Sequence, residues 1–361
     1  MTLYIVIGTV LFLFAAARLS GLIDRKHEAP LVLFLSLLGF AMSFLRWDTG
    51  TDWPMYATMY QTLTTMQAVK EQSWWGPGYA YLAVLLNSWH AGYTVFLFCI
   101  ATLLFGVKYN MLMKSCAAPL VAVFVLFCTS FYDIYFVRQD VAAIMYWAFA
   151  YYLFKRRYQF AFLAAFVSVM FHYSAAAPIA ITLALTQLQG KKLIIGMFCA
   201  AAATYFLVTH INVVALASLT PFASYFGADY IEAKSSGVST TFRAYVKLSY
   251  WLLVTIWALT LALRAESEDE SASWNFFCLK SGTGILLLSA ALLPVSEVFA
   301  RYPLYAVPMY ACVLSNFKIR PAPLSIRGAA YTVFLLLLFV QLGFIYSSFP
   351  ERFYPVKTVF D

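Results

Sequence analysis

Apolar runs about as long as a bilayer is thick recur from Thr2 to Tyr346, with only short polar intervals between them. A transmembrane helix needs about 20 apolar residues, because each residue adds about 1.5 Å and the hydrocarbon core is about 30 Å thick. The composition agrees, since 63% of the residues are hydrophobic and only 11% are charged. The sequence therefore predicts an all-α, polytopic integral membrane protein with about twelve transmembrane helices. The twelve runs are residues 2–18, 29–45, 91–107, 118–134, 137–154, 158–172, 173–189, 193–209, 244–263, 281–297, 302–316 and 327–346.

The chain shows no linker or polar module, so we expect a single integral membrane domain over residues 1–361, with long outer loops at 46–90 and 210–243. We expect the first run to be a retained helix with its N-terminus outside, because no basic residue precedes it and no convincing cleavage pattern follows. The six cysteines form no Cys-x-x-Cys pair and are expected to be packing residues.

The segment 78–89 is apolar but only about half as long as a span, and its placement decides the topology. If it crosses the membrane, the basic clusters at 155–157 and 191–192 fall outside. If it does not cross, fifteen of the 24 basic residues fall inside and nine outside, as the positive-inside rule requires. We therefore expect 78–89 to lie on, or dip into, the outer face as a short helix. Just before it, apolar residues from Trp53 to Met66 recur at three and four, which predicts an amphipathic helix in the outer interface.

With this topology, the charged and polar residues that are hardest to explain structurally all fall at outer helix ends or in outer loops. Six separate segments supply them, which is the pattern of one outward-facing site. The residues are Arg46, Asp48, Asp52, Arg138, Gln139, Asp140, His172, Arg243, Glu297 and Arg301.

Two arginines in this set are candidates for anion binding. Arg46 ends the second run, and Asp52 and Tyr56 follow it. These residues either anchor and cap an interfacial helix, or Arg46 binds an anion while Asp52 orients it or acts as a base. Arg138 and Gln139 open another run, where a cation lies at the unfavourable end of the helix dipole. A charge near the hydrocarbon needs a partner, and a phosphate would serve.

Each of the remaining candidates, considered alone, has a simpler structural explanation. A lone histidine such as His172 is more often a hydrogen-bonded structural residue than a catalyst. Arg301 lies four residues after Glu297, in register for an intrahelical pair, and Arg243 can anchor the membrane edge. Neither histidines at metal spacing nor a close Asp-x-Asp pair in the outer loops is present, so we expect no metal and no cofactor.

Short motifs in a fixed order resemble the EpsG/Wzy family of bacterial polysaccharide polymerases. They read RWDTGTDWPMY, WGPGY, FVRQDVAAI, FHYSA and RYPLY, and together they extend over most of the chain. Family members commonly carry an early arginine, glycine and aspartate, an E-P-G turn, an R-Q pair that opens a helix, and a histidine before a small residue. Here the E-P-G position reads Gly76-Pro77-Gly78, so the family's glutamate is absent unless Glu71 replaces it.

The resemblance implies a multi-pass protein of the bacterial inner membrane whose active site faces the periplasm. It would polymerise oligosaccharide repeat units carried on undecaprenyl pyrophosphate, both as donor and as acceptor, and release undecaprenyl pyrophosphate. Membrane lipid and a chain-length regulator protein are the other expected partners, and no nucleic acid is expected. Asp52 or His172 would act as the catalytic base, and Arg138 would be a further catalytic residue. Substrate would be bound by Arg46, Tyr56, Arg138, Gln139, Arg243 and Arg301.

Two other classes of function stay open. A flippase or secondary transporter for lipid-linked oligosaccharide would need charges deep within its spans, and the predicted spans are nearly free of charge at their centres. An O-antigen ligase uses the same donor as a polymerase, and a membrane acyltransferase would decorate the glycan. Only the order of the motifs favours the polymerase over these enzymes.

Overall fold

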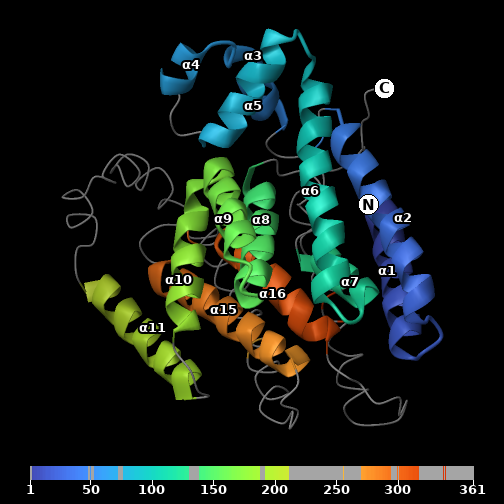
Figure 1. Ribbon diagram of the computed structural model, residues 1–361, viewed down its shortest axis with the longest axis vertical. Coiled ribbons are helices and arrows are strands. Elements are labelled where there is room, and N and C mark those ends of the chain that lie inside the picture. The colour runs from blue at the N-terminus through green and yellow to red at the C-terminus, as the bar shows by residue number, and fades with distance from the viewer. Residues whose placement is uncertain are drawn as a thin grey trace. The chain divides into compact units, whose positions relative to one another are not determined.

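The computed structural model describes most of the N-terminal half of the chain and separate parts of the C-terminal half (Figure 1). All regular elements of the residues that it describes are helices, which confirms the all-α prediction. The chain divides into two compact units, residues 1–176 with 311–361, and residues 177–310. The described residues are 2–47, 49, 53–71, 76–129, 138–187, 192–210, 255, 270–293, 299, 301–316, 336 and 338.

The first unit begins with ten helical elements in chain order. They are α1 (Thr2–Leu19), α2 (Arg25–Phe44), α3 (Trp53–Thr62), α4 (Met66–Glu71), α5 (Pro77–Ser88), α6 (Tyr93–Ser115), α7 (Pro119–Thr129), α8 (Arg138–Phe154), α9 (Tyr158–Phe171) and the short 3₁₀ helix η3 (Tyr173–Ala175). Within this unit α1 packs on α7, α2 on α6, α6 on α8, and α8 on α9. The second unit contains α10 (Ala176–Thr186), α11 (Lys192–His210), α15 (Glu270–Leu292) and most of α16 (Pro303–Ser315).

Ten of the twelve predicted spans coincide with helices, and the other two, 244–263 and 327–346, lie outside the described residues. Among the described residues, three helices are long and apolar enough to cross a membrane by length and composition, namely Arg25–Phe44, Tyr93–Ser115 and Ala272–Leu292. The shorter apolar helices include α7, α9 and α16. The protein is therefore a polytopic, membrane-embedded helical protein. The prediction of one domain over residues 1–361 stays a prediction.

Two of these helices carry lysines that lie outside the predicted spans. Helix α6 continues through Lys108 and Lys114 to Ser115, and α15 begins eleven residues before the predicted span, so Lys280 lies at its middle. Lys280 is only 6% exposed and its Nζ donates to the carbonyl oxygen of Leu185 at 2.6 Å. Leu185 is in the last turn of α10, where free carbonyls favour a cation. Lys280 is therefore an exception to the prediction that the spans are nearly free of charge at their centres, and a helix-end carbonyl accepts a hydrogen bond from its ammonium group.

A buried carboxylate fixes the turn between α1 and α2. Glu28 is fully buried and accepts from the Nε of Arg18 at 2.9 Å and from the backbone N–H of Leu120 at 2.9 Å. Arg18 also donates to the carbonyl oxygen of Ala117, just beyond the end of α6. The α1–α2 turn, the end of α6 and the start of α7 therefore lie together at one end of the first unit.

Helices α3 and α5 pack on the opposite end of α6, and α4 packs on α5 (Figure 1). The predicted amphipathic helix is present as α3, but its apolar face is buried in the protein, with Tyr56 and Tyr60 no more than 4% exposed. Tyr60 donates to the carbonyl oxygen of Ala91 at 2.6 Å, and the Asn87 amide donates to the carbonyl oxygens of Tyr60 and Leu63. The expectation that this apolar face lies in the membrane interface was wrong, because α5 and α6 cover it.

Helix α5 is the short helix predicted within 78–89. Its twelve residues extend about 18 Å at 1.5 Å per residue, well short of a hydrocarbon core of about 30 Å. Buried Tyr79, Ala83 and Leu86 face the protein, whereas Tyr81 and Leu85 are more than two-fifths exposed. Whether this helix lies on the outer face stays a prediction.

Candidate functional site

An arginine and a carboxylate are buried together where α2 ends. Arg46 is 3% exposed and interacts electrostatically with Tyr93, Tyr56, Asp140 and Tyr79. Burial lowers the pKa of the Arg46 guanidinium, and the neighbouring phenols and the Asp140 carboxylate oppose that shift. Because an arginine side chain stays protonated in proteins, Arg46 is a buried cation, and Asp140, 1% exposed, supplies opposite charge.

The second arginine reaches the same place from the start of α8. Arg138 is half-buried, its Nε donates to the Tyr56 hydroxyl at 3.3 Å, and its guanidinium lies 5.7 Å from the centre of the Tyr56 ring. Tyr79 interacts electrostatically with both Arg138 and Arg46. The two arginines therefore converge on one pair of tyrosines. We name this group the arginine–tyrosine cluster; its members are Arg46, Tyr56, Tyr79, Tyr93, Arg138 and Asp140.

Aromatic rings connect the elements that supply the cluster. The Tyr56 and Tyr79 rings are 5.6 Å apart, and Tyr79 contacts Phe96 edge to face at 4.8 Å. Trp53 lies 5.6 Å from Tyr93, also edge to face. Such contacts fix ring positions, and flat aromatic faces are the surfaces on which sugar rings and prenyl chains pack.

The glycine turn before α5 lies directly against the end of α9. Gly76 has φ +77°, and a Cβ there would be 2.7 Å from the carbonyl oxygen of Phe171. A Cβ on Gly78 would be 3.1 Å from atoms of Met170. The positive φ and the close approach both require glycine at position 76. The WGPGY motif is therefore adjacent to the FHYSA motif, whose His172 follows Phe171.

His172 ends α9 and starts η3. Its Nδ1 accepts from the backbone N–H of Ser174 at 3.3 Å and lies 2.6 Å from the Ser174 hydroxyl. When Nδ1 accepts, the neutral ring carries its proton on Nε2. This tautomer makes Nε2 a hydrogen-bond donor, which favours stabilising a charged oxygen over accepting a proton.

The structure brings together several of the residues predicted from the sequence and leaves others apart. Arg46, Tyr56 and Arg138 belong to the cluster, and Gln139 is buried next to Arg138. Asp52 and Arg243 lie outside the described residues. Arg301 belongs to the second unit, where it is exposed just before α16. The roles of all these residues stay predictions.

Tyr79 and Tyr93 were absent from the predicted site residues. Both carried a usable signal, because each tyrosine directly follows a glycine in the first turn of a helix, Tyr79 after Gly78 in α5 and Tyr93 after Gly92 at the start of α6. Tyrosine is common at helix ends beside the membrane boundary, because its side chain has an apolar body and a polar tip.

The fold and the cluster together define a class: a membrane-embedded helical protein with buried and half-buried cations gathered among tyrosines at one end of its helices. A family model narrows this class. The EpsG family model matches residues 30–358, so the chain belongs to the EpsG family, a Wzy-like family of polysaccharide polymerases. Neither a curated protein nor a solved structure gave a match to this chain. We therefore describe it as a membrane protein of the polysaccharide polymerase type.

Proposed function

We propose that the protein is a glycosyltransferase that joins oligosaccharide repeat units carried on undecaprenyl pyrophosphate, at the periplasmic face of the inner membrane. The observation that carries the proposal is the convergence of Arg46 and Arg138 on Tyr56 and Tyr79 in a chain of the EpsG family. Two guanidinium groups supply hydrogen-bond donors and positive charge for a diphosphate without a metal ion, although Asp140 offsets part of the charge of Arg46.

The reaction transfers the growing glycan from its lipid diphosphate to a hydroxyl of the next lipid-linked unit. The bond between the anomeric carbon and the diphosphate oxygen breaks, and a bond from that carbon to the acceptor oxygen forms. The acceptor hydroxyl loses its proton to a base, and undecaprenyl pyrophosphate leaves with the electron pair. The protein has to stabilise the negative charge that builds on the diphosphate.

The different exposure of the two arginines gives them different roles in stabilising this charge. Arg138 is half-buried, so it contacts the diphosphate directly, whereas Arg46 lies beneath the tyrosines and adds positive potential from behind. A buried charge acts strongly at short range because few water molecules screen it. Gln139, Arg243 and Arg301 remain proposed substrate contacts, and Asp52 remains the proposed base. The tautomer of His172 favours donation to the acceptor or leaving oxygen.

The distribution of basic residues supports the outward placement of the cluster. Arg18, Arg25 and Lys26 lie at the α1–α2 turn, and Lys114 lies at the end of α6 away from Tyr93. These are the ends of the first unit opposite the cluster, and the positive-inside rule assigns the lysine- and arginine-rich end to the cytoplasm.

The test is the glycan pattern of a strain from which the gene is deleted. We expect carrier or acceptor that bears a single repeat unit, with long chains restored by the intact gene. Unsubstituted acceptor would instead indicate a ligase, and lipid-linked units accumulating inside the cell would indicate a flippase. With purified protein and lipid-linked repeat units, we expect a ladder of products and one released undecaprenyl pyrophosphate per bond formed.

A further inference from the structure

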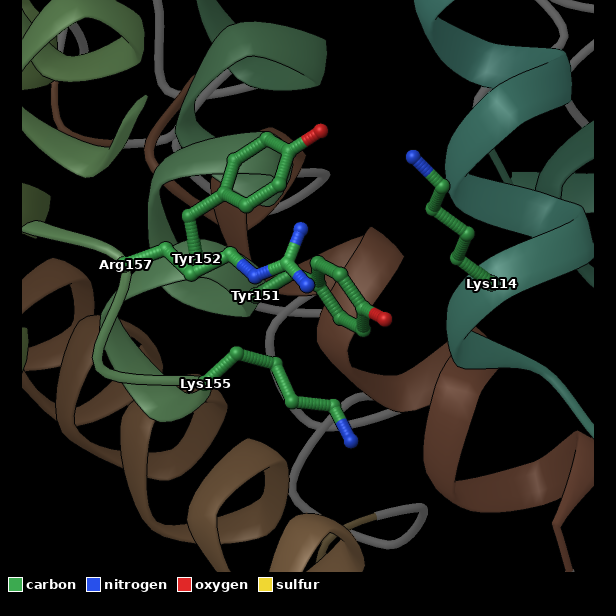
Figure 2. A pocket seen from close by; sticks show the side chains of 5 residues that line it. All are labelled: Lys114, Tyr151, Tyr152, Lys155 and Arg157. Atoms are coloured by element: carbon green, nitrogen blue, oxygen red, sulfur yellow. The ribbon is translucent and has the colours of Figure 1, made fainter. Parts of the chain in front are cut away.

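The end of α8 opposite Arg138 carries a pocket that the proposed reaction does not use. A cavity of about 260 Å³ is lined by Lys114 of α6, Tyr151 and Tyr152 of α8, and Lys155 and Arg157 of the turn that follows α8. Figure 2 shows Lys114 and Arg157 pointing into this space from opposite sides. We name it the basic pocket.

The five described residues that line the basic pocket offer hydrogen-bond donors and positive charge, and none of the five is acidic. Three of its five side chains are cationic and the other two are phenols. The ammonium groups of Lys114 and Lys155 each lie 5.9 Å from a tyrosine ring centre, on Tyr152 and Tyr151 respectively. A cation–π contact orients a cation but leaves its net charge in place. This is the chemistry of a site for a phosphate group.

The backbone holds the turn that supplies two of the cations. Arg157 N–H donates to the carbonyl oxygen of Tyr152 at 2.8 Å, and Arg156 N–H donates to that of Leu153 at 3.0 Å. These are the two hydrogen bonds of a Schellman motif, and Arg156 has the left-handed φ of +56° that the motif requires. The motif satisfies the last carbonyls of α8, so Lys155 and Arg157 are not needed to cap them and remain exposed.

The position of the pocket along the helices indicates a membrane edge. Helix α8 has 17 residues and extends about 26 Å from Arg138 to Phe154, close to a hydrocarbon thickness of about 30 Å. Helix α6 likewise leads from Tyr93 of the cluster to Lys114 of the pocket. The cluster and the basic pocket therefore lie at opposite ends of the same two helices.

An apolar surface begins directly beside the pocket. Arg157 also lines a second, more open hollow of about 430 Å³, together with Tyr158 and Phe160. From there Tyr158, Phe162 and Phe166 follow at intervals of four along α9, exposed by 64%, 74% and 52%. In a membrane-embedded protein such a stripe faces acyl chains. A soluble phosphate has no apolar part that could pack on this stripe.

We propose that the basic pocket binds the phosphate of an anionic phospholipid headgroup, with the acyl chains of that lipid lying along the exposed face of α9. The cavity is somewhat smaller than the 300–1,000 Å³ typical of sites for drug-sized ligands, so it suits a headgroup better than an oligosaccharide. Basic pockets at the cytoplasmic ends of membrane helices are suited to anionic headgroups by charge and position.

The experiment uses the full-length protein in detergent and in nanodiscs, with phosphatidylglycerol and phosphatidylcholine as probes. Native mass spectrometry counts lipids retained by the wild type and by the double variant Lys114→Gln/Arg157→Gln. We expect the wild type to retain phosphatidylglycerol in preference to phosphatidylcholine. Each neutralised cation should weaken phosphatidylglycerol retention about fivefold, so the double variant should lose roughly 25-fold.

The matched control is Lys26→Gln, because Lys26 is an exposed cation in the α1–α2 turn and lies outside the pocket. It should retain the lipid like the wild type, and the variant Arg157→Lys, which preserves the charge, should retain it within about twofold of the wild type. Equal loss in Lys26→Gln, or equal retention of the two lipids by the wild type, would overturn the proposal. Displacement of phosphatidylglycerol by millimolar inorganic phosphate would also overturn it, because the site would then belong to a soluble anion.

Discussion

The two ends of α8 carry similar side chains in opposite physical states. At one end Arg46 is buried with Asp140 among Tyr56, Tyr79 and Tyr93, whereas at the other Lys114, Lys155 and Arg157 are exposed. A buried charge costs several kcal/mol of desolvation unless it is paired, so the first group requires fixed partners. An exposed cation at a membrane edge costs little and needs none.

The difference in burial suggests a different role for each region. A buried, paired cluster holds its charges in fixed positions before substrate arrives, which is what stabilises charge during a reaction. An exposed cluster can exchange partners and adapt to a lipid headgroup. Substitutions at the buried end should therefore change stability or catalysis strongly, and those at the exposed end should not.

The largest effect is expected from Arg46→Met, which removes one partner of the buried pair. The Asp140 carboxylate would remain buried with less opposite charge, and the free energy of unfolding should fall by about 3–5 kcal/mol. Unfolding in mixed detergent measures this change. The double variant Arg46→Met/Asp140→Asn should recover more than half of the loss. If the stability lost by the double variant equals the sum of the losses of the two single variants, Arg46 and Asp140 are not coupled.

Next in size is Arg138→Ala, which should lower the polymerisation rate at least ~100-fold while leaving folding nearly intact, since Arg138 is only half-buried. The assay follows chain length with lipid-linked repeat units. Lys70→Ala, which removes an exposed lysine of α4 near the same end, serves as the control and should polymerise normally. Normal long chains from Arg138→Ala would show that the cluster does not act on the diphosphate.

A smaller effect is expected from Gly76→Ala. The added Cβ would meet the Phe171 carbonyl oxygen in a backbone conformation with φ +77°, and stability should fall by about 2 kcal/mol. Gly92→Ala is the matched control, because it has φ −73° and its Cβ would have no neighbour within 4 Å. Equal melting temperatures for the two variants would mean that the glycine turn does not hold α5 against α9.

Ser174→Ala tests the tautomer of His172. Without the Ser174 hydroxyl, one hydrogen bond to Nδ1 is lost, and activity should fall by a few-fold, about 1 kcal/mol. Ser88→Ala, which removes an exposed hydroxyl at the end of α5, provides the comparison. A gain in activity at high pH specific to Ser174→Ala would argue that His172 acts as a base after all.

The smallest effect, and one of opposite sign, is expected at the exposed end. Arg156→Gly should raise stability by about 0.5–1 kcal/mol, because glycine adopts a positive φ without the strain that a side chain imposes. Thermal unfolding measures the gain, and Arg157→Gly, where φ is −92°, should show no gain. A loss of stability in Arg156→Gly would mean that its side chain makes a stabilising contact.

The class of fold could be predicted from the sequence, because the length of the apolar runs and the scarcity of charge leave a chain few alternatives in a bilayer. The sequence also showed that α5 is too short to span a bilayer. It identified Arg46 and Arg138 as candidates, because a cation near hydrocarbon is costly, and Tyr56 as a neighbour of Arg46 in sequence. It could not fix where α6 and α15 begin and end. A lysine beside an apolar run looks like a loop residue until a partner such as the Leu185 carbonyl is known.

The buried face of each helix, and the contacts between residues distant in sequence, became known only from the packing of the helices. The apolar stripe of α3 fits a membrane interface as well as a protein core, and contacts with α5 and α6 resolve the choice. Tyr79 and Tyr93 belong to the cluster because of contacts between elements that are distant in sequence, and such contacts cannot be predicted from residue spacing. The glycine at position 76 is explained by the same kind of contact, because the end of α9 leaves no room there for a side chain.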